Sequence, residues 1–315
     1  MQTDAREDSA IIFPGISPAP FAETARFLLI DPVARRMLAE ADEVLGCSVL
    51  ERHREAGDDY SAGARVAFLV SCLALARWAG RTLGISPRLV AGPSFGGVPA
   101  AVHSGALGFA DAVSLTASWG RVTEEYFTRE HRDVVTLSVA RLPEDRLERV
   151  LEELKGSEEW YGVACFVDAD FHLVSVHESR VEWLQDRMRA EGGMPLSVMR
   201  PPMHSSRFGG LRETIERELF GGLRFADPVI PVVSDHDGTV LTSGAQLREL
   251  VLDAVVRPVR WPAVIARLRR EGIRTFCVSG PDAMWGRVAS VRKNFEVVAV
   301  KPKTALQPRR RPAPV

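Results

Sequence analysis

Short apolar runs alternate with helical patterns along the first 128 residues. Residues 10–14 (AIIFP) are apolar and lead into Pro-Gly, which predicts a buried strand followed by a turn. Apolar positions at helical spacing predict a helix from about residue 21 to residue 50 with a stop at Gly46. Residues 62–83 are apolar on nearly every face, which predicts a buried helix that ends at Gly84. The remaining expected elements here are a strand over 88–91 and helices over 97–107 and 110–128.

The pattern changes near residue 129. Alternating residues 133–140 predict a strand, and residues 142–156 predict an amphipathic helix with acidic residues first. Strands over 161–167 and 172–177, a helix over 179–191 and a strand over 194–200 complete a β-α-β-β-α-β order. This order is typical of a ferredoxin-like unit. We therefore expect a ferredoxin-like small subdomain at 129–200, inserted into a larger α/β subdomain made of 1–128 and 201–305.

The last third returns to the α/β pattern. We expect a strand over 229–233 and another over 274–278, and then a polar, basic tail. Helices are expected over 207–220, before Pro258 and over 262–271. Residues 306–315 (LQPRRRPAPV) are expected to be a disordered tail because they are basic and rich in proline.

Composition and charge exclude several classes of protein. The 315 residues are 46% hydrophobic and 26% charged, as in globular domains and unlike disordered chains or coiled coils. A net charge of -1 disfavours a general nucleic-acid binder, although residues 254–303 hold eleven Lys/Arg against three Asp/Glu. The polar N-terminus and the absence of an uncharged apolar run of about 18 residues argue against a signal peptide and a membrane span. We expect a cytoplasmic protein that does not bind a membrane.

Cysteine and histidine spacing gives no metal signature. The four cysteines are far apart in the sequence and are expected to be reduced core thiols, as in the cytosol. The seven histidines show no HxxxH spacing. No metal is expected.

The clearest chemical motif is Gly92-Pro93-Ser94-Phe95-Gly96, a G-x-S-x-G turn between an expected strand and an expected helix. Small flanking residues allow the strained turn that lifts the serine hydroxyl into a cleft, where the Phe95 N–H can donate to an oxyanion. The alternative is a glycine-rich connection with an incidental serine. A nucleophilic serine needs a base, and His204, just before a helix, is the best candidate. His103 and His236 are weaker alternatives.

Several motifs, in order along residues 10–300, resemble the malonyl-CoA:acyl-carrier-protein transacylase family. Residues 13–15 (FPG) resemble the start of that family's FPGQGSQ, and residues 90–113 resemble its VAGHSLGE…AAGALSFEDAV. Residues 202–205 (PMHS) stand where the family has an AFHS-like motif with the catalytic histidine, and residues 257–261 (RPVRW) match its PV-x-W segment. Among its members the chain is most similar to the trans-acting acyltransferases of macrolactam (vicenistatin-type) polyketide pathways.

The resemblance implies an α/β-hydrolase-like large subdomain with a parallel sheet and a ping-pong acyltransfer. Ser94 would attack a thioester and His204 would take its proton, with the His204 ring oriented by the Ala254 carbonyl. The oxyanion donors would be the backbone N–H groups of Phe95 and Ile16. No cofactor would be bound, because the acyl group arrives on the phosphopantetheine of an acyl carrier protein or on CoA.

Departures from the family pattern affect the substrate. Trp119 stands where malonyl-using members have the arginine that holds the free carboxylate, and an indole cannot make that charge-assisted contact. Arg121 could bind the carboxylate only after a shift in register, because it lies two residues beyond Trp119 and therefore about 200° around the helix from it. Pro93 replaces the histidine before the nucleophile, and Met203 follows a changed Pro-Pro pair. A non-malonyl acyl group is therefore expected.

The macrolactam members transfer aminoacyl or dipeptidyl starters between discrete carrier proteins and polyketide-synthase loading domains, and the resemblance implies the same here. Asp168 and Asp170 could attract the amine of such a substrate, or they could form a solvated turn. Carrier proteins present acidic helices, so basic residues should dock them; the candidates are Arg149, Arg207, Arg270, Arg274, Arg292, Lys293 and Lys301. The alternatives are a proofreading thioesterase, an atypical malonyltransferase and a non-catalytic scaffold that binds carrier proteins.

Overall fold

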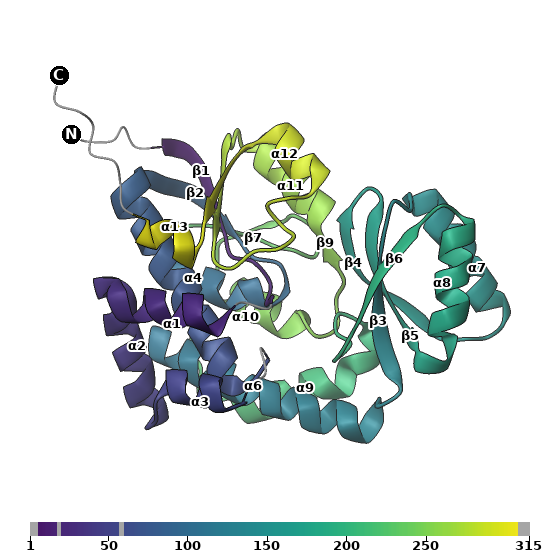
Figure 1. The fold of residues 1–315 in the computed structure, drawn as a ribbon, viewed down its shortest axis with the longest axis horizontal. Coiled ribbons are helices and arrows are strands. Elements are labelled where there is room, and N and C mark those ends of the chain that lie inside the picture. The colour runs from purple at the N-terminus through teal and green to yellow at the C-terminus, as the bar shows by residue number, and fades with distance from the viewer. Residues whose placement is uncertain (1–5, 18–19, 57–59, 308–315) are drawn as a thin grey trace.

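A six-stranded, mostly parallel sheet lies at the centre of the larger part of the molecule (Figure 1). The computed structural model describes residues 6–17, 20–56 and 60–307. The strand order is β11-β10-β1-β2-β7-β8, and only β8 pairs antiparallel. The strands are β1 (Arg6–Ile12), β2 (Ile85–Ala91), β7 (Val232–Val233), β8 (Val240–Leu241), β10 (Thr275–Ser279) and β11 (Glu296–Val300).

Helices cover both faces of this sheet, because successive residues of a strand point to opposite sides. Ile11 of β1 faces one hydrophobic cluster, whereas Ile12 faces the other. The larger cluster is built with α1 (Phe21–Ile30), α2 (Pro32–Leu45), α3 (Val49–Ala56), α4 (Ala62–Leu83), α5 (Gly97–His103), α6 (Phe109–Glu130), α9 (Gly209–Leu219), α10 (Gly244–Asp253) and α13 (Pro302–Leu306). On the opposite face pack α11 (Trp261–Arg270) and α12 (Ala289–Asn294).

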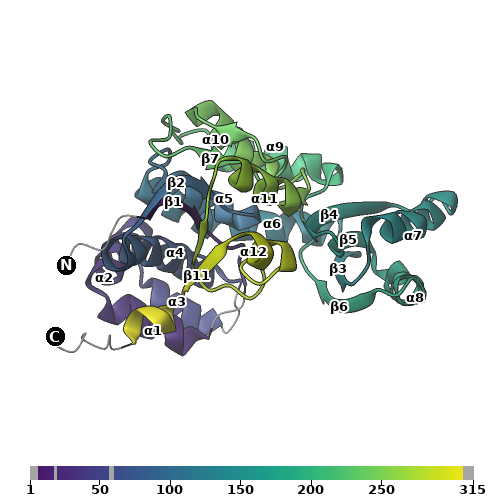
Figure 2. The same ribbon diagram turned by 90° about the horizontal axis from the view of Figure 1, so that it is seen from above.

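A smaller sheet extends to one side of the molecule (Figures 1 and 2). Its order is β6-β3-β5-β4-β9; the first four strands pair antiparallel with one another, as in a ferredoxin-like unit, and β9 pairs parallel with β4. Its elements are β3 (Val134–Ala140), α7 (Glu144–Gly156), β4 (Tyr161–Asp168), β5 (Phe171–His177), α8 (Val181–Ala190), β6 (Met194–Met199) and β9 (Val259–Arg260). Both α7 and α8 pack on one face of this small sheet. Its other face is free of these two helices and points toward the large sheet.

Local chemistry explains where the expected long helix is divided. Asp31 ends α1 and caps α2, because its carboxylate accepts hydrogen bonds from the N–H groups of Val33 and Ala34, both at 2.9 Å. Pro32 suits the first position of α2, and Gly46 ends that helix with a left-handed φ of 63°. The expected helix over residues 21–50 is therefore three helices.

The prediction that a polar, basic tail follows the strand over 274–278 is wrong up to residue 306. The residues after β10 form α12, β11 and α13, and β11 is the edge strand of the large sheet. The expected strand over 229–233 shortens to Val232–Val233, and β9 was not expected. Leu306 belongs to α13, and residues 308–315 of the predicted disordered tail lie outside the described residues.

The α4 helix is the central apolar element. Within the described part of the chain it is the one helix that is long and apolar enough to cross a membrane, yet 78% of its apolar window is buried inside the protein. It contacts α2, α3, α6 and strands of the large sheet. Its apolar sequence is therefore explained by its place in the core.

Candidate active site

Ser94 stands on a strained turn directly after β2. Its φ is +56°, a left-handed value that costs energy for a residue with a side chain. A Cβ on Gly92 would lie 2.0 Å from the Gly96 carbonyl oxygen, and a Cβ on Gly96 would lie 2.1 Å from that of Phe13. Both flanking positions of the G-x-S-x-G motif therefore require glycine in this structure.

His204 meets Ser94 from the loop that follows β6. Its Nε2 lies 2.9 Å from the Ser94 Oγ, a normal hydrogen-bond distance, although the two residues are 110 positions apart. His204 also has a left-handed φ, +66°, and its side chain is buried. Two strained residues thus present their side chains to each other, and the serine hydroxyl can donate to a neutral imidazole.

Burial keeps the His204 imidazole neutral. The pKa of His204 is lowered to about 4, chiefly by burial and also by the nearby His236, while the backbone of Arg257 acts in the opposite direction. Its Nδ1 has no well-formed hydrogen bond to any described residue. The predicted orienting residue Ala254 lines the same cavity, but the backbone that acts on His204 is that of Arg257.

Asp235 is a site residue that the sequence did not reveal. The Ser94 N–H donates to its Oδ2 at 2.8 Å, and the Arg260 N–H donates to its backbone oxygen at 2.7 Å. Beside it, His236 Nδ1 lies 3.3 Å from the Pro258 oxygen. Burial raises the pKa of the Asp235 carboxyl, with opposing effects from His236 and the Ser94 N–H. The 234–236 turn therefore connects the nucleophile turn to residues 258–260.

The two alternative histidines do not take the place of His204. His103 packs in α5 with its ring 5.4 Å from that of Phe13, and burial lowers its pKa to about 4. His236 is buried next to Asp235. Neither forms the hydrogen bond to Ser94 that His204 makes.

A cavity of about 250 Å³ surrounds the Ser94–His204 pair, between the large sheet and the helix-free face of the small sheet. Five predicted residues line it besides the pair: Ile16, Phe95, Trp119, Met203 and Ala254. Pro93 does not line it; its carbonyl accepts from the Gly96 N–H at 2.9 Å and so shapes the turn. The cavity wall is mostly apolar, which excludes water from the reacting carbonyl.

The two predicted amine-attracting carboxylates are not in this cavity, so that hypothesis is corrected. Asp168 accepts from the Ser290 N–H at 3.0 Å at the start of α12, and it accepts from Ala169 at 2.9 Å. Asp170 is exposed in the β4–β5 turn. Asp168 therefore holds a helix end in place rather than a substrate.

Two arginines line one end of the cavity, and neither is at the position of Trp119. Arg121 does not line this cavity, and it pairs with Glu125 at 3.0 Å. Arg65 and Arg200 both line the wall. The Arg65 Nε donates to the Tyr60 oxygen at 2.7 Å, and Arg200 pairs with Glu178 at 2.7 Å. Both arginines already have partners in the protein.

Comparisons with known proteins agree with this geometry. The family described as "VinK acyltransferase small domain" matches residues 138–199. The malonyl CoA-acyl carrier protein transacylase of Bacillus subtilis is 25% identical over 276 residues, which cover 85% of this chain and 86% of that protein. The crystal structure of FabD from Acinetobacter baumannii superposes with a TM-score of 0.84, at 20% identity over 96% of each chain. The chain is an acyltransferase.

A second solved structure with a similar fold contains an acyl-carrier protein. A malonyl-transacylase in complex with its type II PKS acyl-carrier protein has a TM-score of 0.81 at 22% identity, over 95% of this chain and 98% of that one. These solved structures establish the fold of the acyltransferase, and the expected fold class is confirmed. The sequence relatives support membership of the malonyl-CoA:acyl carrier protein transacylase family.

The basic residues predicted to dock a carrier protein lie on separate parts of the acyltransferase. Arg149 is on α7, on the outer side of the small sheet, whereas Arg292 and Lys293 are on α12 (Figure 1). Several already have partners: Arg149 pairs with Asp145 and Glu191, Arg274 with Asp8, Arg207 lies over the Trp160 ring, and Lys301 donates to the Asp282 oxygen. Arg270 is exposed at the end of α11. The seven residues therefore do not form one patch.

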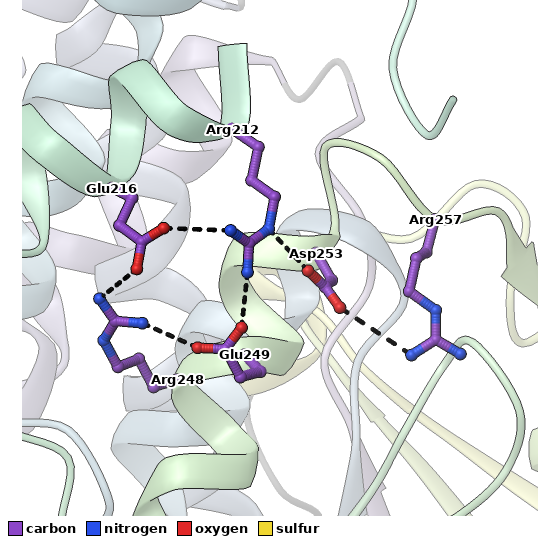
Figure 3. Close-up of polar contacts among 6 residues, drawn as sticks. All are labelled: Arg212, Glu216, Arg248, Glu249, Asp253 and Arg257. Atoms are coloured by element: carbon purple, nitrogen blue, oxygen red, sulfur yellow. Dashed lines mark hydrogen bonds and ion pairs between the residues drawn. The ribbon is translucent and has the colours of Figure 1, made fainter. Parts of the chain in front are cut away.

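An ion-pair network joins α9 and α10 (Figure 3). Arg212 contacts Glu216 at 3.0 Å, Asp253 at 2.8 Å and also Glu249, and Arg248 pairs with Glu216 and Glu249, each at 2.8 Å. Asp253 lies 4.0 Å from Arg257. The network thus fixes the end of α10, where the Val255 oxygen accepts from the Ser205 N–H at 3.2 Å.

The four cysteines are free in the structure, and three of them are buried. Burial raises the pKa of the Cys277 thiol to about 12, so this thiol is unreactive. In the described part of the chain, no group of three or more His, Cys, Asp or Glu residues could hold a metal ion.

Proposed function

We propose that this acyltransferase moves a non-malonyl acyl group between acyl carrier proteins through an acyl-serine intermediate. The observation that carries the proposal is the 2.9 Å contact between Ser94 Oγ and His204 Nε2, in a cavity where Trp119 occupies the expected arginine position. A nucleophile and a neutral base in contact, facing an apolar cavity, are suited to acyl transfer.

The first half-reaction forms the acyl-enzyme. Ser94 Oγ attacks the thioester carbonyl while His204 Nε2 takes the hydroxyl proton. The N–H groups of Phe95 and Ile16 stabilise the oxyanion, as two residues of the cavity wall. The C–S bond then breaks, and His204 returns the proton to the leaving thiolate. The products are a free thiol and an acyl-serine ester.

The second half-reaction runs in reverse with a different thiol. His204 takes the proton of the incoming phosphopantetheine thiol, and the sulfur attacks the acyl-serine ester. The acyl group leaves on the acceptor and Ser94 recovers its proton. Donor and acceptor are acyl carrier proteins, and no cofactor of the enzyme itself takes part. The malonyl-transacylase relative in complex with its acyl-carrier protein supports this choice of partner.

The substrate is an aminoacyl or dipeptidyl starter for polyketide biosynthesis in the cytoplasm, delivered to a polyketide-synthase loading domain. The match of residues 138–199 to the VinK acyltransferase small domain supports this assignment. Trp119 supports it as well, because a buried malonyl carboxylate beside an indole would lack its charged partner.

A standard malonyl transfer is the second candidate. The curated relatives carry that name, and Arg65 and Arg200 line one end of the cavity. In this case one of these arginines would have to leave its present partner to bind the malonyl carboxylate.

The test is intact-mass detection of the acyl group on Ser94 after incubation with acyl carrier proteins that carry acetyl, malonyl, β-aminoacyl or dipeptidyl groups. We expect aminoacyl or dipeptidyl loading in preference to malonyl, and no loading of Ser94→Ala. Preferential malonyl loading would establish the second candidate instead. Unchanged loading of Ser94→Ala would refute the acyl-serine intermediate.

A second measurement separates transfer from hydrolysis and from a scaffold role. The loaded enzyme is incubated with and without an acceptor carrier protein, and the acyl product is followed. We expect the acyl-enzyme to persist alone and to discharge on addition of the acceptor. Rapid release of free acid without acceptor would identify a thioesterase, and failure to load any acyl group would favour a scaffold.

A further inference from the structure

The inner face of α6 carries two hydroxyl groups without partners. Thr116, Trp119 and Thr123 are spaced i, i+3 and i+7 on this helix, so they share one face, and all three line the Ser94 cavity. Thr116 and Thr123 are 1% and 2% exposed. The Oγ1 atoms of both lack a hydrogen-bond partner in the described residues.

An unpaired buried hydroxyl is costly, so its persistence needs an explanation. Leaving such a group unsatisfied costs about 1–3 kcal/mol. Thr136, which also lines the cavity, shows the usual outcome: its hydroxyl lies 2.8 Å from that of Ser175. The two threonines of α6 lie on either side of Trp119 in the sequence instead, and both line the cavity. They are placed to bind a neutral group of the substrate that can donate or accept a hydrogen bond.

A second cavity continues from the first at this point. It has a volume of about 780 Å³ and lies along α6. Five residues line both cavities: Tyr60, Arg65, Thr123, Arg200 and Pro201. Thr123 therefore stands where the two spaces meet, and a chain attached to Ser94 has room to extend past it.

We infer that Thr116 and Thr123 bind amide or hydroxyl groups of an acyl chain that extends from Ser94 past Trp119 into the second cavity. The inference rests on the proposed function and names the chemistry of its substrate: a long acyl group with neutral hydrogen-bonding groups beyond the thioester carbonyl. A plain alkyl chain of the same length would exclude water and leave both hydroxyls unpaired. Sites built to hydrogen-bond a substrate reject analogues that lack the partner group.

The test compares two thioesters of equal chain length, the N-acetyl-β-alanyl and hexanoyl thioesters of N-acetylcysteamine. The rate of Ser94 acylation is followed by intact mass, and the N-acetyl-β-alanyl group is expected to react faster. Equal or faster reaction of hexanoyl would overturn the inference and leave the proposed function standing. Absence of any acyl-serine from both would overturn the proposed function, and the inference with it.

Isosteric variants locate the effect. Thr123→Val and Thr116→Val remove one hydroxyl each, and each is expected to lower the amide-to-alkyl rate ratio about threefold to tenfold. Thr24→Val is the matched control: Thr24 is 2% exposed with an unpartnered hydroxyl, but it lies in α1 and lines neither cavity. Its ratio should equal that of the wild type. If all three variants behave alike, the inference is wrong.

A filling variant tests the second cavity by itself. Gly120 lines only the second cavity, and a Cβ there would lie 3.2 Å from the Nε end of Arg65. Gly120→Leu should slow acylation by an N-octanoyl-β-alanyl thioester at least tenfold more than acylation by the N-acetyl-β-alanyl thioester. Equal slowing of the two would show that the chain does not enter this space.

Discussion

The strained conformation of Ser94 lies in a turn that its neighbours hold in place. Gly92 and Gly96 each bring backbone atoms within about 2 Å of where a Cβ would be, and Asp235 accepts the Ser94 N–H. The two glycines are visible in the sequence because they belong to a short motif. Asp235 is not, because it lies 141 residues from Ser94 and only folding brings them together. The sequence thus predicted the Ser94–His204 pair, but it did not reveal Asp235, which accepts a hydrogen bond from the Ser94 N–H.

The first prediction concerns this buried carboxyl. Asp235→Ala leaves the Ser94 N–H without an acceptor, which should lower the free energy of unfolding by about 1–3 kcal/mol and slow acylation by at least tenfold. Asp235→Asn keeps a side-chain oxygen and should retain most of the acylation rate. Both are measured by denaturant titration and by the rate of acyl-serine formation. If Asp235→Asn formed acyl-serine as slowly as Asp235→Ala, the charge of Asp235 would be needed, and a side-chain oxygen that accepts a hydrogen bond would not be enough.

The second prediction concerns the pH dependence of acylation. His204 acts as a base only when it is neutral, which holds at every pH above its pKa of about 4. The acylation rate should therefore stay level from pH 8 to about 5 and reach half its value near pH 4, measured by quench and intact mass on folded enzyme. His236→Gln removes a group that lowers this pKa, so it should shift the half-point upward. A wild-type half-point near 6.5 would contradict this account.

At the scale of elements, long and strongly patterned segments were predictable and short or tertiary ones were not. The α4 helix has the expected bounds because apolar residues and Gly84 define both its body and its end. The β9 strand has two residues, and its pairing with β4 depends on the assembled sheet. The β11 strand follows a basic segment that resembled a tail, and it pairs only at a sheet edge. Local pattern carries little information about such pairings.

The third prediction tests the network of α9 and α10 (Figure 3). Arg212 touches three carboxylates and its side chain is 23% exposed, so Arg212→Met should lower the free energy of unfolding by about 1–2 kcal/mol. Arg217→Met on the same helix removes one exposed pair with Glu218 and should change stability by less than about 0.5 kcal/mol. Thermal and denaturant unfolding give both values. Equal effects would mean that the network adds nothing beyond single surface pairs.

For the whole molecule, several buried neutral histidines make stability depend on pH. Burial lowers the pKa of His103 and His204 to about 4, while an unfolded histidine titrates near 6.5. Between these values the unfolded chain binds more protons than the folded one, so stability is full above pH 6.5 and is lost as pH falls. The raised pKa of Asp235 acts in the opposite direction.

The fourth prediction follows from the loss of stability as the pH falls below about 6.5. The free energy of unfolding should fall by about 2–4 kcal/mol between pH 7 and pH 5, measured by urea titration at each pH. His103→Gln keeps a polar side chain in α5 without a titrating group, and the fall should be about half as large. A free energy that does not change with pH over this interval would contradict the burial of both imidazoles in their neutral form.

The pairing of β9 with β4 also sets rules for protein engineering. Val259 and Arg260 come from the C-terminal half of the chain but complete the small sheet, where Cys165 pairs with Val259 and Phe166 with Arg260. A chimera that exchanges only residues 129–200 with a relative would cut this sheet between its last two strands and pair a foreign β4 with the native β9. Grafts should therefore carry both segments together, and a recombination boundary between them will separate partners that evolved to fit.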